Sequence, residues 1–195
     1  MSYGGPMIYL GIAADIGLSE SEARILKNIG ESLAHAGWIL RTGGRSDFED
    51  SMLDGASSVD KYRTELITPT PYFRHYTPSS AGVQPVTQLN ERVQSRALSM
   101  LVASPEKLSY KSIHQKIVLS TAGTLVFGPQ LNTPVRFAIT WLRDDDRQSK
   151  LKSPDSPIYS TLEDRNIPIF NLGRHEHRTR IEAFVNTSMS RAASF

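Results

Sequence analysis

Short apolar runs alternate along this chain with segments in which apolar residues recur at helical spacing. The apolar runs read as strands buried on both faces, as in a parallel sheet. The predicted strands are residues 7–14, 38–40, 65–68, 136–142 and 167–172. The predicted helices lie between Ser19 and Gly37 and over residues 47–56, 89–101, 109–127, 161–165 and 174–190. This order predicts an α/β fold, a single Rossmann-like domain over residues 1–195, with helices on both faces of a mainly parallel sheet of about five strands.

The first predicted helix has clear end signals. Ser19 and Glu22 have the spacing of a capping box, and Gly37 stands where a glycine commonly ends a helix.

Two segments have no periodic pattern. Residues 70–85 are rich in proline, tyrosine and serine, which predicts a long loop. Residues 143–157 are charged and contain two prolines, which predicts a solvated, mobile loop that would become a lid if a ligand ordered it.

Composition excludes several classes of function. The chain is 39% hydrophobic and 22% charged, as in globular proteins, and it has no cysteine, so disulfides, thiolate metal sites and cysteine nucleophiles are excluded. The apolar start lacks a basic region and is interrupted by Asp15, so a strand is expected there, not a signal peptide. No apolar stretch has the roughly 18 residues of a membrane span, and a cytoplasmic protein is expected. A net charge of +2 does not support strong non-specific DNA binding.

The segment Thr42-Gly43-Gly44-Arg45-Ser46 is the strongest candidate for chemistry. Adjacent glycines allow positive φ and the close approach of a ligand, and the first amides of the following helix favour an anion. Thr42 and Ser46 add hydroxyl donors, and Arg45 has a guanidinium suited to phosphate. A side chain at Gly44 is therefore expected to occupy ligand space while the fold survives. The alternative is an ordinary turn with Asp47 as helix N-cap, since the segment is neither a full GxGxxG nor a Walker A motif.

Residues 37–56, GWILRTGGRSDFEDSMLDGA, resemble the segment of the SLOG superfamily in which a strand ends in RSGG and a helix ends in GA. That superfamily contains DNA-processing protein A and the cytokinin-activating phosphoribohydrolases. Two later segments also resemble it, residues 127–134 before the strand RFAITW and residues 167–172, IPIFNL. The closest resemblance is to uncharacterised phage-encoded members, which implies a nucleotide ligand and, for a phage protein, the host cytoplasm.

The chain also departs from the family pattern. Glu49 takes the position of the family's acidic residue, and Asp47 replaces a glycine. Residues 156–161 stand in place of a second glycine turn, GGTxxA. The phosphoribohydrolase signature PGGxGTxxE is absent, so that activity is not carried over.

Further ligand-binding residues are expected where strands end, because ligands of open α/β sheets bind at the carboxyl ends of the strands. Ala14 and Asp15 lie at the carboxyl end of the first predicted strand, and Trp141 and Arg143 lie at the carboxyl end of the fourth. The indole and the guanidinium could stack on a base. The alternative is a core tryptophan beside an exposed arginine. No metal site is expected.

Four functions remain open from the sequence. The first is a binding protein for a nucleotide or a nucleotide-derived ligand, ADP-ribose-like or a cyclic nucleotide, acting as a sensor or sequestering protein. The second is a single-stranded DNA-binding recombination mediator. The third is a hydrolase of an N-glycosidic or phosphate bond with Glu49 or Asp47 as catalytic acid or base. The fourth is a structural role in a phage particle. A homodimer is expected only by analogy with similar domains.

Overall fold

The computed structural model describes residues 5–13, 17–77, 79, 82–101, 111–142 and 155–192, with only the backbone for residues 188–192. Within this part of the chain, six strands form one sheet in the order β4-β3-β2-β1-β5-β6, and every neighbouring pair is parallel. The strands are β1 (Ile8–Gly11), β2 (Ile39–Thr42), β3 (Thr64–Thr68), β4 (Val83–Pro85), β5 (Ala138–Thr140) and β6 (Ile169–Asn171). The predicted Rossmann-like fold is confirmed, with six strands where about five were expected.

The strand that the sequence pattern missed is β4, which lies in the segment predicted as a loop. It has three residues and ends in Pro85, at the edge of the sheet. Proline has no N–H to donate to a neighbouring strand and is therefore tolerated at a sheet edge. A three-residue strand that contains proline carries too little pattern to be recognised.

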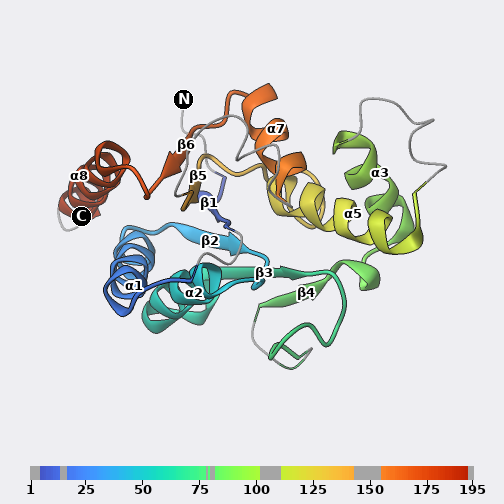
Figure 1. Cartoon of the computed structure of the whole chain (residues 1–195), viewed down its shortest axis with the longest axis horizontal. Coiled ribbons are helices and arrows are strands. Elements are labelled where there is room, and N and C mark those ends of the chain that lie inside the picture. Colours follow the sequence, from blue (N-terminus) through green and yellow to red (C-terminus); the bar gives the residue numbers. More distant parts are fainter. Residues whose placement is uncertain are drawn as a thin grey trace.

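Helices cover both faces of the sheet (Figure 1). α1 (Glu20–His35), α2 (Asp47–Val59) and α8 (His175–Ala192) pack on one face, and α5 (Ile113–Phe127) and α7 (Ser156–Asp164) on the other. α3 (Glu91–Leu101) packs against α5, and short 3-10 turns occupy Lys61–Arg63 and Val86–Gln88. Each face of the sheet has its own hydrophobic core, and successive side chains of β1 point to opposite faces. Tyr9 packs in the core on the α1 side, and Ile8 and Leu10 pack in the core on the α5 side.

The predicted signals at the two ends of α1 are confirmed. Ser19 and Glu22 form the predicted capping box, with Ser19 N donating to Glu22 Oε2 at 2.8 Å, and Gly37 has a φ of +88°. Three of the strands, β1, β5 and β6, are shorter than the apolar runs that predicted them. α7 begins five residues before its predicted start of 161, because Ser156 and Pro157 already form its first turn.

The connections from β1 and to β5 place a topological switch point between these neighbouring strands. The chain leaves β1 for β2 over one face and reaches β5 over the other, so β1 lies between them in the sheet. Ligands of open α/β sheets bind at the carboxyl edge near such a point. The predicted residues Ala14, Asp15 and Arg143 lie outside the described residues.

The predicted loop 143–157 lies outside the described residues except at its end. Asp155 is 1% exposed, and residues 156 and 157 belong to α7. The prediction of a solvated loop is therefore wrong for residues 155–157, because they start a helix that packs on the sheet.

None of the helices that the structure describes could cross a membrane, since none combines enough length with enough apolar character.

Candidate functional site

The turn after β2 is held by its own hydrogen bonds. α2 is capped by Ser46, whose Oγ accepts from the backbone N–H of Glu49 at 3.4 Å. The alternative prediction of Asp47 as N-cap is therefore wrong. Asp47 is exposed and lies 3.4 Å from Nη2 of Arg74. Ser46 can cap because its backbone is extended, as N-cap residues require.

Both hydroxyl groups that were expected to donate to a phosphate bind backbone carbonyls instead. Thr42 Oγ1 donates to Gly11 O at 2.9 Å, and Ser46 Oγ donates to Ala13 O at 2.7 Å. Both side chains are buried. A hydroxyl has one hydrogen to donate, so each would have to give up its carbonyl partner before it could donate to a ligand. These bonds tie the turn to the end of β1.

Gly44 is needed by the fold itself. Gly44 has a φ of +61°, as the pattern predicted, but a Cβ added there would lie 2.5 Å from Tyr76 Cε2 and 2.9 Å from Leu66 Cδ1. The expectation that a side chain at Gly44 would occupy ligand space is therefore wrong, because protein atoms already fill that position. A Cβ at Gly43 would lie 2.7 Å from Nε of Arg45. The arginine thus folds back over the turn.

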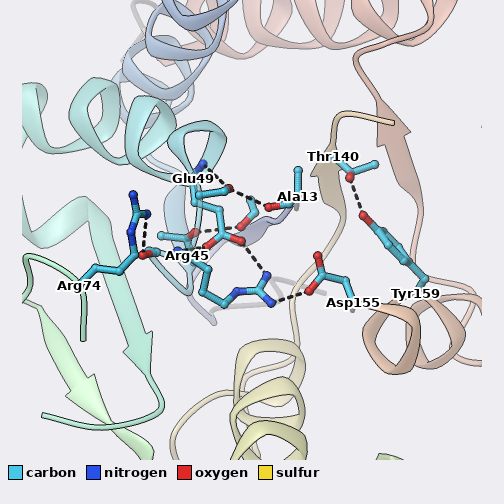
Figure 2. A network of polar contacts seen from close by, with 11 residues as sticks. Ala13, Arg45, Glu49, Arg74, Thr140, Asp155 and Tyr159 are labelled. Carbon is cyan, nitrogen blue, oxygen red and sulfur yellow. Dashed lines mark hydrogen bonds and ion pairs between the residues drawn. The ribbon is translucent and has the colours of Figure 1, made fainter. Parts of the chain in front are cut away.

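Arg45 lies between two buried carboxylates, and we call Arg45, Glu49 and Asp155 the Arg45 cluster (Figure 2). Its Nη2 lies 2.7 Å from Glu49 Oε1, its backbone N–H donates to Glu49 Oε2 at 2.8 Å, and its Nη1 donates to Asp155 Oδ1. Glu49 has no exposed surface and Asp155 is 1% exposed, whereas the side chain of Arg45 is 26% exposed. Two helices on opposite faces of the sheet are thereby joined at its carboxyl edge.

The charges of the cluster are tightly coupled. Burial acts to lower the pKa of the Arg45 guanidinium, but the carboxylates of Glu49 and Asp155 outweigh it and raise that pKa. Burial raises the pKa of the Glu49 carboxyl, while Arg45 acts against that increase. Two carboxylates face one guanidinium, so the cluster presents no excess positive charge to a phosphate. Glu49 accepts from the backbone N–H and from Nη2 of Arg45, and Asp155 accepts from Nη1.

The position of Asp155 depends on the attachment of α7. The hydroxyls of Tyr159 in α7 and Thr140 at the end of β5 are 2.7 Å apart and buried (Figure 2). Burial is the main cause of the raised pKa of Tyr159. The hydroxyl pair holds the first turn of α7 over the sheet, and with it the carboxylate of Asp155.

The segment after β3 covers the start of α2. Arg74 donates from Nη1 to Gly44 O at 3.1 Å and lies 3.0 Å from Asp50 Oδ2, and Tyr76 donates to Asp50 Oδ1 at 2.6 Å. Burial, together with Asp50, raises the pKa of Tyr76. Arg74 and Tyr76 were not among the predicted site residues, since they lie in a segment predicted only as a loop.

A cavity of about 310 Å³ opens beside the turn, and we call it the carboxyl-edge cavity. Arg45 and Asp155 of the cluster line it, and most of its other lining residues are apolar. Its lining includes Arg45 from the turn, Pro69 and Phe73 after β3, Ile117 and Val118 from α5, and Asp155 before α7. Glu49 and Asp47 do not line it. Small-molecule sites commonly have this form, an apolar pocket with a few convergent polar groups.

Arg41, at the start of the RTGG segment, stabilises the fold and does not line the carboxyl-edge cavity. It is fully buried, with Nε donating to Glu65 Oε2 at 2.7 Å and Nη1 donating to Thr133 O at 2.8 Å. Burial lowers its pKa, and the Glu65 carboxylate opposes this. Arg41 therefore joins β2 to β3 and to Thr133, in the segment between α5 and β5.

Trp141 occupies the core on the α1 side of the sheet. It is 4% exposed, and Cζ of Arg178 lies 5.5 Å from its ring centre. Of the two interpretations of Trp141, the structure agrees with the core tryptophan. It does not line the carboxyl-edge cavity.

Comparison with known proteins gives no match to a family model, a curated protein or a solved structure.

Proposed function

We propose that this protein binds a nucleotide or a nucleotide-derived ligand, ADP-ribose-like or a cyclic nucleotide, in the carboxyl-edge cavity. The observation that carries this proposal is the cavity of about 310 Å³ beside the glycine turn, at the edge where open α/β sheets hold ligands. Its volume lies at the lower end of the range of about 300–1,000 Å³ that is typical of small-molecule sites. The resemblance to the SLOG superfamily supports the same ligand class.

The charges of the cavity favour an orientation for the ligand. The apolar wall of Phe73, Ile117 and Val118 suits a ring. The Arg45 cluster has no excess positive charge, so it suits neutral hydroxyl or amino groups of a ribose or base better than a phosphate. His114, an exposed residue of the first turn of α5, also lines the cavity and offers a hydrogen bond to a phosphate. In this orientation the ring packs on the apolar wall, the polar groups of the ribose or base contact the Arg45 cluster, and the phosphate lies toward the start of α5.

The positions of Glu49 and Asp47, the two candidate catalytic residues, favour binding over hydrolysis. Glu49 has no exposed surface, and Asp47 is exposed outside the cavity and paired with Arg74. A general acid or base must come within hydrogen-bond reach of the reacting atoms. Neither carboxylate lies on the cavity wall.

Calorimetric titration with AMP, ADP-ribose and 3′,5′-cyclic AMP tests the proposal. Val118→Trp is the informative variant, because Val118 lines the cavity and is 42% exposed, so an indole can enter the cavity without disturbing the core. Ile113→Trp is the matched control on the same helix, since Ile113 is 79% exposed and does not line the cavity.

At least one of these nucleotides should bind the wild type, and Val118→Trp should weaken it at least tenfold while Ile113→Trp binds like the wild type. Failure of all three nucleotides to bind, or equal affinity of both variants, would contradict the proposal. An oligodeoxynucleotide titration run in parallel tests the single-stranded DNA alternative. Binding of the oligodeoxynucleotide alone would favour that function.

A further inference from the structure

A second cavity, of about 360 Å³, lies at the opposite edge of the sheet. It is lined by residues at the starts of β2, β5 and β6 and by residues of α8, and we call it the amino-edge cavity. Trp38 directly precedes β2, Phe137 directly precedes β5, and Pro168 directly precedes β6. Because the strands are parallel, this edge faces away from the Arg45 cluster. Among the residues that the structure describes, none lines both cavities.

Aromatic rings dominate the wall of the amino-edge cavity. The ring centres of Trp38 and Phe137 are 4.9 Å apart and those of Trp38 and Phe184 are 5.6 Å apart, both edge to face. Phe170 packs edge-on against Phe137 at 5.8 Å. Phe184 is 38% exposed, a large fraction for this side chain. The rings form a connected surface that reaches solvent.

Two arginines accompany these rings. Arg136 precedes Phe137, and Arg180 projects from α8 with its Cζ 5.4 Å from the ring centre of Phe170. Both are exposed, and neither forms an ion pair with any of the residues that the structure describes. This distinguishes them from Arg41, Arg45 and Arg74, which all contact carboxylates. None of the described residues that line this cavity is acidic.

We propose that the amino-edge cavity binds an aromatic ring that carries a phosphate, that is, a nucleotide unit, either free or within a single strand of nucleic acid. The rings of Trp38 and Phe184 offer a stacking surface for a base, and guanidinium groups form strong, charge-assisted hydrogen bonds with phosphate. A purely apolar ligand would leave Arg136 and Arg180 without a counter-charge. A phosphate without a ring would leave the aromatic surface uncovered. This site is independent of the one proposed for the carboxyl-edge cavity.

Tryptophan fluorescence tests the site directly. The chain has two tryptophans, Trp38 in the cavity wall and Trp141 in the core, so Trp141→Phe leaves Trp38 as the sole reporter. The probes are thymidine 5′-monophosphate and an oligodeoxythymidylate, which distinguish a free nucleotide from a strand. The wild type compared with Trp38→Phe gives the same information if Trp141→Phe does not fold.

Saturable quenching of Trp38 is expected, and Arg136→Ala and Arg180→Ala should each weaken the binding at least tenfold. Arg92→Ala is the control, since Arg92 is an exposed arginine of α3 that does not line the cavity. Tighter binding of the oligonucleotide would support a strand as the ligand, and equal binding of the two probes would support a single nucleotide. Absence of saturable quenching with both probes, or an unchanged affinity in both arginine variants, would overturn the proposal.

Discussion

Asp155, just before α7, forms an ion pair with Arg45 in the turn after β2, although the two residues are 110 positions apart in the sequence. The contact crosses the carboxyl edge of the sheet, because α7 and α2 cover opposite faces. Glu49 completes the arrangement from the first turn of α2. An arginine that follows two glycines resembles a phosphate-binding residue in the sequence. Here its charge is balanced by carboxylates of the protein itself.

The packing around Gly44 predicts a loss of stability on substitution. Gly17→Ala is a matched control, because Gly17 has a φ of +59° but no atom of the described residues lies within 4 Å of an added Cβ. Its cost should be the backbone strain alone, about 1–2 kcal/mol. Gly44→Ala adds the clash with Tyr76 and Leu66 and should cost clearly more in urea unfolding. Equal costs for the two variants would show that the Tyr76 ring yields without penalty.

The raised pKa of Glu49 predicts a pH dependence of stability. The folded protein holds this proton more tightly than the unfolded chain, whose glutamates have pKa values of about 4.3. The contribution of this proton to stability is therefore fully present below that value and is lost as the pH rises through the raised pKa of the folded state.

Glu49→Gln removes this proton equilibrium. The free energy of unfolding of the wild type should fall relative to that of Glu49→Gln as the pH is raised from 4, as measured by urea unfolding at each pH. Glu182→Gln, at an exposed position of α8, controls for the loss of one surface charge. A wild type that gains stability relative to Glu49→Gln over this range would show that the Arg45 ion pair outweighs burial.

Arg41 is expected to contribute strongly to stability. Arg41→Met removes the cation that faces Glu65 and leaves Thr133 O without its donor. Breaking a buried pair commonly costs about 3–5 kcal/mol, and the lower end is expected because the side chain of Glu65 is 28% exposed. Thermal and urea unfolding measure this cost, with the exposed Arg92→Ala as control. A loss below about 1 kcal/mol, the size of a surface pair, would contradict this role.

The fold could be predicted from the sequence because its signals are local. Apolar runs, the capping box at Ser19 and Glu22, and Gly37 each report on a few neighbouring residues, and together they define the order of strands and helices. β4 was missed because its three residues, which include Pro85, form a strand only by pairing with β3.

The site could be predicted only in part, for the same reason. The turn and its positive φ at Gly44 follow from the glycine pair, but the partners of its side chains come from distant segments. Asp155 and Tyr76 reach the turn from regions predicted as loops, and their contacts leave no local pattern. Trp141 was correctly placed at the carboxyl end of the strand that the structure shows as β5, yet only the packing of α8 shows that it faces the core.

Hydrogen–deuterium exchange in the presence of AMP, ADP-ribose or 3′,5′-cyclic AMP tests the central claim most directly, because it reports where the ligand lies. The claim predicts slower exchange in residues 69–77 and 113–122, which contain Phe73 and Val118 of the carboxyl-edge cavity, and unchanged exchange in α1. Unchanged exchange in both cavity segments at saturating nucleotide would contradict it, as would protection confined to residues 168–184 at the other edge of the sheet.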